Sequence, residues 1–278
     1  MALDTLLDQC FLDEAARAGQ DRWLLLQTAY TGPSRRTALD TLPVTAASRV
    51  ADLGCGFGAA VLEIADRFGA EVHGFDLAEH RLATAREISG RLPTVAGRVH
   101  FATADVTRDV PPEPYDIVTA RFVLQYLPAV ATLKHWAKWL KPGGVLYLEE
   151  VDDGWTVDYP PPPPAWQRVI DAYRQASRAA GSDREIGRKL SHLLIEANYQ
   201  LQHLAWNSQA ALQIERIGDP AVSFERERLE AASADLIASG YLTADQLAEG
   251  IRQFQAAYPR LGFVSNATIR ILATQRPG

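Results

Sequence analysis

The sequence predicts an α/β fold with a doubly wound parallel sheet, and two observations support this. From Val50 onwards, short apolar segments typical of strands alternate with stretches long enough for helices. A glycine-rich turn directly follows the first of these strands, at the end of the sheet where such folds bind ligands. The predicted strands cover residues 49–54, 70–77, 98–106, 115–121, 144–152, 200–207 and 263–275.

Helices are predicted before and between these strands. In the first forty residues, leucines such as Leu3, Leu6 and Leu7 recur at helical spacing, and Gly32-Pro33 interrupts the pattern. Later helices are predicted at 59–69, 78–92, 127–140 and 184–199. The first of these closes at Gly69, and the third ends before the turn sequence KPGG.

A helical cap is predicted outside the sheet. Residues 160–164 are five consecutive prolines, which form a stiff spacer between the fifth strand and a helix at 166–181. Between the last two strands lie about fifty residues, with a charged helical stretch from Phe224 to Tyr258. This stretch is longer than a simple connection needs, so we expect it to build a lid or a substrate pocket.

The composition is that of a soluble globular protein and disfavours several partners. Hydrophobic residues make up 47% and charged residues 22%, and the formal net charge is −6. Nucleic-acid binding normally needs a basic surface, so no nucleic-acid partner is expected. The amino-terminal residues have no basic and apolar signal pattern, and no apolar run reaches bilayer length. We therefore expect a cytoplasmic protein without membrane contact.

The glycine turn fits two kinds of cofactor. Gly54, Gly56, Gly58 and Ala59 match the string G-x-G-x-x-G/A of dinucleotide-binding dehydrogenases as well as the shorter turn of other nucleotide-bearing cofactors. Glycines let the backbone approach a ligand closely, and the following helix start offers free N–H groups. The turn alone does not separate hydride transfer from group transfer.

Three acids near strand ends favour group transfer. Asp52 precedes the turn, where an acid suits a cofactor with a cationic centre and an amino group and repels a pyrophosphate. Asp76 ends the second strand, where an acid grips ribose hydroxyls in either kind of cofactor. Asp105 ends the third strand and can accept from an adenine amino group. The set points away from a nicotinamide cofactor.

Ordered motifs resemble class I S-adenosylmethionine-dependent methyltransferases of the bacterial small-molecule type. These are VADLGCGFG, VHGFDLAEHRLATAR, ATADV, YDIVTARFVLQYLP and LKPGGVLYLEEVD, which together cover about residues 48–152. The resemblance implies a Rossmann-like, doubly wound, seven-stranded sheet with N-terminal helices and a helical cap or insertion. It also implies S-adenosyl-L-methionine as the cofactor and S-adenosyl-L-homocysteine as its product.

The resemblance assigns roles around this cofactor. The glycines and Asp52 surround its methionine portion, Asp76 takes the ribose diol, and Arg121 and Phe122 line the floor near the sulfonium. Tyr30 and Arg35 close over the methionine carboxylate. The full set of expected cofactor residues is Tyr30, Arg35, Asp52, Gly54, Cys55, Gly56, Gly58, Asp76, Leu77, Ala104, Asp105, Val106, Arg121 and Phe122.

Candidate catalytic groups follow the fourth and fifth strands. The stretch LEEVDD ends the fifth strand, where a carboxylate can act as a base on an acceptor. Glu150 and Asp152 are predicted to be catalytic together with Tyr126, which can also line an apolar pocket. Cys55 has no histidine partner placed by the sequence, so no nucleophile role is expected. The six histidines show no metal-ligand spacing, and no metal is expected.

The predicted function is transfer of a methyl group to oxygen, nitrogen or carbon of a small molecule, in bacterial secondary metabolism. The alternatives are a protein of this fold that cyclises or rearranges its substrate, an NAD-dependent oxidoreductase, or a pure binding module. The expected domains are an N-terminal segment at 1–42 that closes over the cofactor and a cofactor-binding core at 43–152. A proline-rich loop and cap helix at 153–183 follow, then the rest of the sheet at 184–278 with a helical insertion at about 208–260. A monomer or homodimer is expected.

Overall fold

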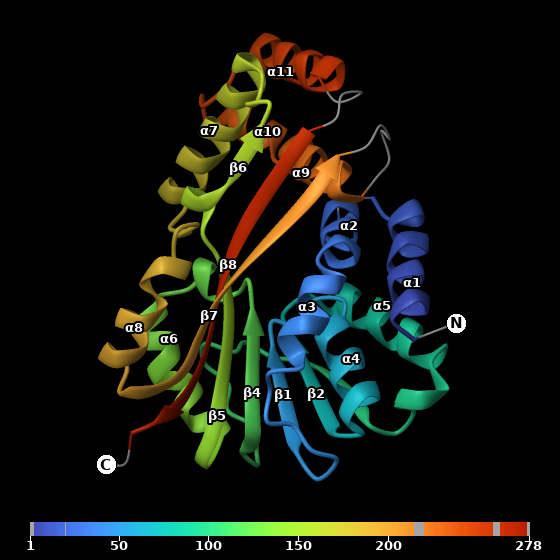
Figure 1. Ribbon diagram of the computed structural model, residues 1–278, viewed down its shortest axis with the longest axis vertical. Helices are drawn as coiled ribbons and strands as arrows, with labels where there is room; N and C mark the ends of the chain where they lie inside the picture. The colour runs from blue at the N-terminus through green and yellow to red at the C-terminus, as the bar shows by residue number, and fades with distance from the viewer. Residues whose placement is uncertain (1–2, 20, 214–219, 258–261, 277–278) are drawn as a thin grey trace. The chain divides into compact units, whose positions relative to one another are not determined.

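A computed structural model describes residues 3–19, 21–213, 220–257 and 262–276. Within these ranges the chain forms eight strands, which belong to one sheet (Figure 1). Their bounds are β1 Arg49–Leu53, β2 Glu71–Asp76, β3 Val99–Thr103, β4 Tyr115–Arg121, β5 Leu140–Val151, β6 Val157–Tyr159, β7 Tyr199–Gln213 and β8 Gly262–Gln275.

The sheet has the order β3-β2-β1-β4-β5-β8-β6, and β7 also pairs with β8. Strands β1 to β5 are parallel, whereas β8 runs antiparallel to β5 and to β6. The predicted doubly wound sheet is confirmed; seven strands lie along its path, and β7 is an eighth strand that pairs with β8. The short strand β6 lies in a stretch that the sequence predicts as a turn-rich loop.

The chain divides into two compact units. The sheet unit comprises residues 34–152, 185–207 and 268–278, and the helical unit comprises residues 1–33, 153–184 and 208–267. Strands β7 and β8 each have residues in both units. Residues 199–207 of β7 and 268–275 of β8 belong to the sheet unit, and the rest of each strand belongs to the helical unit.

Helices cover both faces of the sheet unit. In Figure 1, α4 and α5 lie along β1 and β2, and α6 and α8 lie side by side next to β5. Trp136 of α6, Trp139 of the adjoining 3-10 segment η3 and Leu190 of α8 are buried in the core of this unit. The helices and short 3-10 segments of this unit are α3 Gly32–Leu39, whose first two residues belong to the helical unit, α4 Ala59–Phe68, α5 Glu79–Gly90, η1 Pro93–Val95, η2 Leu124–Tyr126, α6 Ala129–Trp136, η3 Ala137–Trp139, η5 Gly187–Lys189 and α8 Leu190–Glu196.

The helical unit has its own apolar core. Trp166 and Val169 of one helix pack with Leu229 and Phe254 from the segment between β7 and β8. Gly250 permits a close approach there, since a Cβ at this position would lie 2.6 Å from a methyl group of Val169. The helices and short 3-10 segment of this unit are α1 Leu3–Arg17, α2 Arg22–Tyr30, η4 Asp153–Trp155, α7 Pro164–Ala179, α9 Pro220–Ala231, α10 Ser233–Ala238 and α11 Ala244–Ala257. Among the described residues, no helix has the length and apolar character needed to cross a membrane.

Gly74, in the middle of β2, lets the glycine turn after β1 pack against the sheet. A Cβ on Gly74 would lie 2.8 Å from the sulfur of Cys55 and 2.9 Å from side-chain carbons of Phe101 and Val61. These distances are too short for carbon contacts, so any larger side chain must displace the turn or its neighbours.

Gly74→Ala is therefore expected to lower the free energy of unfolding by about 1–3 kcal/mol, because it overpacks the core. Gly90→Ala is the matched control, since no atom lies within 4 Å of a Cβ at that helical position. The control is expected to raise the free energy of unfolding by about 0.5–1 kcal/mol. Urea unfolding of both variants and the parent protein measures the difference. Equal stability of the two variants would contradict the packing argument.

Candidate functional site

The glycine turn after β1 adopts a left-handed backbone. Gly54, Gly56 and Gly58 have φ angles of 71°, 54° and 77°, which favour glycine. The N–H groups of Gly54 and Cys55 donate to the carbonyl of Phe75 at 2.7 and 2.9 Å, which attaches the turn to β2. A Cβ on Gly54 would collide with Val123, whereas a Cβ on Gly56 would meet no atom within 4 Å. The turn is therefore packed on one side and open at its tip.

Asp76, at the end of β2, is bonded to the tip of this turn. Its Oδ2 accepts from the N–H of Gly56 at 2.8 Å, and its Oδ1 accepts from the N–H of Ala78 at 2.9 Å. The side chain of the next residue, Leu77, is 68% exposed. An ordered carboxylate thus lies next to an uncovered apolar side chain, an arrangement suited to a ribose and a flat ring.

Ala104, Asp105 and Val106 follow β3 next to Asp76. The N–H of Ala104 donates to the carbonyl of Asp76 at 3.1 Å. The Asp105 carboxylate accepts from the N–H and hydroxyl of Thr107 at 3.0 and 2.6 Å, and these bonds lower its pKa. Val106 is 8% exposed. The structure thus brings the predicted ribose and adenine segments together, with Asp105 stabilising its own turn.

Asp52, at the end of β1, is a buried carboxyl group. It is 4% exposed, and its Oδ1 accepts from the hydroxyl of Thr119 at 2.6 Å. Burial raises its pKa to about 6, although the Thr119 hydrogen bond and the charges of Arg121 and Arg35 lower it. Because burial disfavours the charged form of this carboxyl group, a cationic group placed beside it would stabilise the carboxylate.

Arg35 is 1% exposed and pairs with a residue that the sequence analysis missed. Its Nε and Nη2 donate to the two carboxylate oxygens of Glu63 at 2.7 and 2.8 Å, and Arg36 lies 3.3 Å from the same carboxylate. Glu63 is fully buried in α4, the helix that follows the glycine turn. The available signal was a glutamate in the middle of the apolar run AAVLEIA. The two hydrogen bonds between Arg35 and Glu63 therefore hold the first residues of the sheet unit against α4.

A buried row of charges crosses β4, β5 and β8. Arg121, Glu149 and Arg270 are direct cross-strand neighbours. The Nε of Arg121 donates to Glu149 at 2.6 Å, and the Nε of Arg270 lies 3.6 Å from the other oxygen of that carboxylate. Although burial opposes the charge of Glu149, the two arginines and the hydroxyl of Thr268 lower its pKa to about 2. The row therefore stays ionised with one carboxylate between two guanidinium groups.

Arg121 keeps a donor without a partner. Its Nη2 is buried and makes no hydrogen bond in the described part of the chain. Its guanidinium lies 4.8 Å from the ring centre of Phe122, whose φ of 60° is uncommon for a residue other than glycine. A buried, unsatisfied, charged donor costs free energy. Arg121 is thus prepared to donate to an anionic group.

The three residues predicted to be catalytic occupy different surroundings. Glu150 is fully buried and accepts from the N–H groups of Val123 and Leu124 at 2.8 and 2.6 Å, and burial raises its pKa to about 8. Asp152 is 1% exposed and binds Arg188 through both carboxylate oxygens. Tyr126 is 55% exposed. Their catalytic roles stay predictions.

Two further predicted cofactor residues have distinct positions. Tyr30 is the last residue of α2 and belongs to the helical unit. Cys55 lies inside the glycine turn with its sulfur against β2, and burial raises the pKa of its thiol well above the usual range. A thiol that stays protonated at neutral pH is a poor nucleophile.

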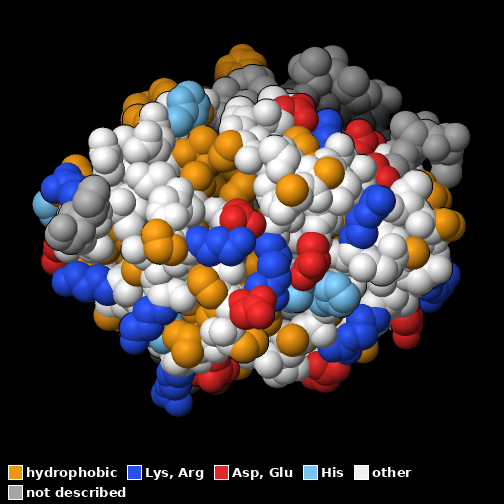
Figure 2. Space-filling view, turned by 90° about the horizontal axis from the view of Figure 1, so that it is seen from below, with side chains coloured by type: hydrophobic (Ala, Val, Ile, Leu, Met, Phe, Trp, Pro, Cys, Tyr) orange, Lys and Arg blue, Asp and Glu red, His pale blue; other side chains and the backbone are white. Residues whose placement is uncertain are grey.

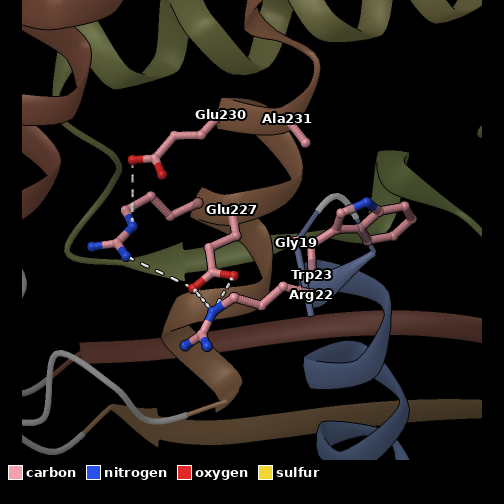
Figure 3. Close-up of a pocket in the computed structure, with 7 residues that line it drawn as sticks. Gly19, Arg22, Trp23, Glu227, Glu230 and Ala231 are labelled. Atoms are coloured by element: carbon pink, nitrogen blue, oxygen red, sulfur yellow. Dashed lines mark hydrogen bonds and ion pairs between the residues drawn. The ribbon is translucent and has the colours of Figure 1, made fainter. Parts of the chain in front are cut away.

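The helical unit contains a polar pocket of about 390 Å³, within the usual size range of small-molecule sites (Figure 3). Arg22 pairs with Glu227 at 2.8 Å, and Arg226 lies 3.5 Å from Glu230. In Figure 3 the ring of Trp23 lies apart from these charged groups. The lining residues are Gly19, Arg22, Trp23, Arg226, Glu227, Glu230 and Ala231.

The central part of the chain matches a known family. Residues 50–144 match a family described as a methyltransferase domain. A trans-aconitate 2-methyltransferase of Streptomyces avermitilis is 39% identical over 105 residues, which are 37% of this chain and 38% of that protein. A phosphoethanolamine N-methyltransferase 3 of Arabidopsis thaliana is 30% identical over 114 residues, 40% of this chain and 23% of that protein. The chain thus spans less than half the length of each relative.

A solved structure agrees over more of the chain. A SAM-dependent methyltransferase of Thiobacillus denitrificans, in complex with S-adenosyl-L-homocysteine, has a TM-score of 0.53 at 19% identity. The match covers 88% of this chain and 92% of that one, and at this identity it supports the fold. Residues 50–144 therefore match a methyltransferase domain, and the chain has the class I S-adenosylmethionine-dependent methyltransferase fold that its motifs predict.

Proposed function

We propose that the protein transfers the methyl group of S-adenosylmethionine to a small molecule. The observation that carries this proposal is the glycine turn flanked by two acids, with buried Asp52 behind it and Asp76 bonded to its open tip. The family match over this segment supports the same function. The secondary-metabolic setting stays a prediction.

The residues present suit the chemical groups of this cofactor. Asp52, with its raised pKa, would accept from the cationic α-amino group at the base of the turn. Asp76 would accept from the ribose hydroxyls at the open tip, beside Gly56. The exposed side chain of Leu77 would pack on the adenine ring. When bound, the cofactor supplies a methyl group that is already electrophilic because it is attached to a positively charged sulfur.

The protein's task is then to hold an acceptor in line with that methyl group. We infer that the acceptor carries a carboxylate, and two observations support this. The Nη2 of Arg121 is a buried donor that can bind a carboxylate oxygen. The Streptomyces relative is a trans-aconitate 2-methyltransferase, whose name specifies a carboxylic acid. A carboxylate is ionised at neutral pH, so it needs no general base.

Binding of S-adenosyl-L-homocysteine tests the cofactor. We expect calorimetric titration to detect this ligand at micromolar concentration and to detect no binding of NAD. Asp76→Ala is expected to weaken the affinity by about tenfold or more, because it removes a charged hydrogen-bond acceptor. Glu87→Gln, at an exposed position of α5, is the matched control and should bind as the parent does. Unchanged affinity in Asp76→Ala would refute the ribose assignment.

The pH dependence of binding tests Asp52. In the proposed complex, the α-amino group of the ligand pairs with the ionised carboxylate of Asp52. The pKa of this carboxyl group is about 6 in the protein without ligand. The dissociation constant of S-adenosyl-L-homocysteine should therefore be constant above pH 7 and about tenfold higher at pH 5. Asp52→Asn should bind more weakly at pH 7 and lose this dependence. A flat profile in the parent protein would rule out this role.

Transfer of a labelled methyl group to a panel of acceptors tests the substrate class. We expect label on trans-aconitate or a related carboxylic acid and none on phosphoethanolamine. Arg121→Lys should raise the KM of that acceptor about tenfold or more and leave the affinity for S-adenosyl-L-homocysteine unchanged, because lysine lacks the separate Nε and Nη2 donors, of which Nε is bound to Glu149 and Nη2 is left for the acceptor. A weaker affinity for S-adenosyl-L-homocysteine would instead assign Arg121 to the cofactor.

Two other outcomes would redirect the proposal. If Trp23→Ala raises the KM and Arg121→Lys does not, the acceptor is bound by the pocket of the helical unit. If the protein binds S-adenosyl-L-homocysteine but labels no carboxylic acid, while a substrate is converted without label, the rearrangement alternative holds.

A further inference from the structure

Three possible metal ligands lie together where the second and third strands begin. Glu71 and His73 are two positions apart on β2 and therefore point to the same face of the sheet. His100 of β3 is the direct register partner of His73, which places it on that face too. The imidazole Nε2 of His73 lies 2.6 Å from an oxygen of Glu71, and the two imidazole rings have centres 4.7 Å apart. One ligand atom from each residue lies within 4.8 Å of the others.

The first residues of β2 and β3 on this face are open to solvent, although Trp139 packs against Phe75 further along β2. Residues 104–114, which connect β3 to β4, contain turns and no helix. Glu71 and His100 are consequently exposed and His73 is partly exposed. Figure 2 looks at this end of the sheet and shows histidine, acidic and basic side chains gathered near its centre. An ion can reach the cluster without displacing the core.

The cluster is partly ordered before any ion binds. The ring of His73 packs edge-on against Tyr115, with ring centres 5.4 Å apart. The backbone hydrogen bonds between β2 and β3 fix the spacing between His73 and His100. Little conformational entropy remains to be lost on binding, apart from rotation of the exposed side chains.

We propose that Glu71, His73 and His100 bind a divalent transition-metal ion such as Zn²⁺. Two imidazoles and one carboxylate are a ligand set that Zn²⁺ accepts, with water in the remaining position. Imidazole nitrogens favour Zn²⁺, Ni²⁺ or Cu²⁺ over Mg²⁺ and Ca²⁺, which prefer oxygen ligands. Such an ion would join β2 to β3 at their first residues and stabilise this edge of the sheet.

Arg49 competes with the ion for Glu71. Its Nε lies 3.1 Å from the same Glu71 oxygen that contacts His73. Arg49 has other partners, since its Nη1 donates to Glu113 at 3.1 Å and its guanidinium lies 4.7 Å from the ring centre of Tyr115. The Arg49 side chain can therefore release Glu71 to a metal ion and keep these contacts. Its positive charge nonetheless opposes a bound cation.

Calorimetric titration of tag-free protein with Zn²⁺ at pH 7.5 tests the site. We expect one equivalent to bind, and no detectable binding of Mg²⁺ under the same conditions. His100→Ala should weaken Zn²⁺ binding by about tenfold or more, because it removes one of three ligands. His203→Ala, which removes an exposed histidine elsewhere in the sheet unit, should leave it unchanged. Zn²⁺ should also raise the melting temperature of the parent protein and of His203→Ala by the same amount, and that of His100→Ala by less.

Arg49→Gln provides a test in the opposite direction. It removes the competing cation and should tighten Zn²⁺ binding several-fold. Absence of stoichiometric Zn²⁺ binding, or equal affinity in the parent protein and His100→Ala, would overturn the proposal. Circular dichroism at the same pH verifies that the exposed substitutions leave the fold intact.

Discussion

The buried row of charges formed by Arg121, Glu149 and Arg270 connects β4, β5 and β8 near the carboxyl ends of the parallel strands. A buried carboxylate is stable only with partners that offset its desolvation, and here two guanidinium groups lie on either side of it. The observed register meets this requirement, because it places Arg121 of β4 and Arg270 of β8 directly beside Glu149 of β5. Arg270 also donates to the carbonyl of Ser34 at 2.8 Å, so the same row attaches α3 to the sheet. The ion pairs thus link local strand register to the position of the elements around the glycine turn.

Buried acids at this end of the sheet differ in charge because their surroundings differ. Glu149 faces two arginines and keeps a pKa of about 2, whereas Asp52 has one hydroxyl donor and a pKa of about 6. Glu150 points away from Glu149 on the same strand, meets backbone N–H groups and has a pKa of about 8. Asp52, with a pKa of about 6, is mostly ionised at neutral pH and lies directly before the glycine turn. The difference supports its proposed place beside the amino group of the cofactor.

The sequence was sufficient to predict the sheet, the glycine turn and the proximity of Asp76 to that turn, because strand periodicity and parallel connections follow local rules. It was not sufficient for contacts that depend on register or on side-chain direction. Glu63 and Arg35 meet through the packing of α3 on α4, and no local pattern specifies that pair. The histidines lack metal spacing along the chain because His73 and His100 become neighbours only through the pairing of β2 with β3.

The acidic stretch at the end of β5 suggested a general base, and the structure gives its carboxylates other partners. Glu149 is paired with arginines, Glu150 holds the backbone after β4, and Asp152 binds Arg188. Diverting Glu149 or Glu150 to serve a reaction would leave a buried partner unsatisfied, which costs free energy. An acceptor that is already ionised needs no general base, so these acids can keep their structural partners. A carboxylate bound by the remaining donor of Arg121 is therefore the substrate class most compatible with acids that are already engaged in the fold.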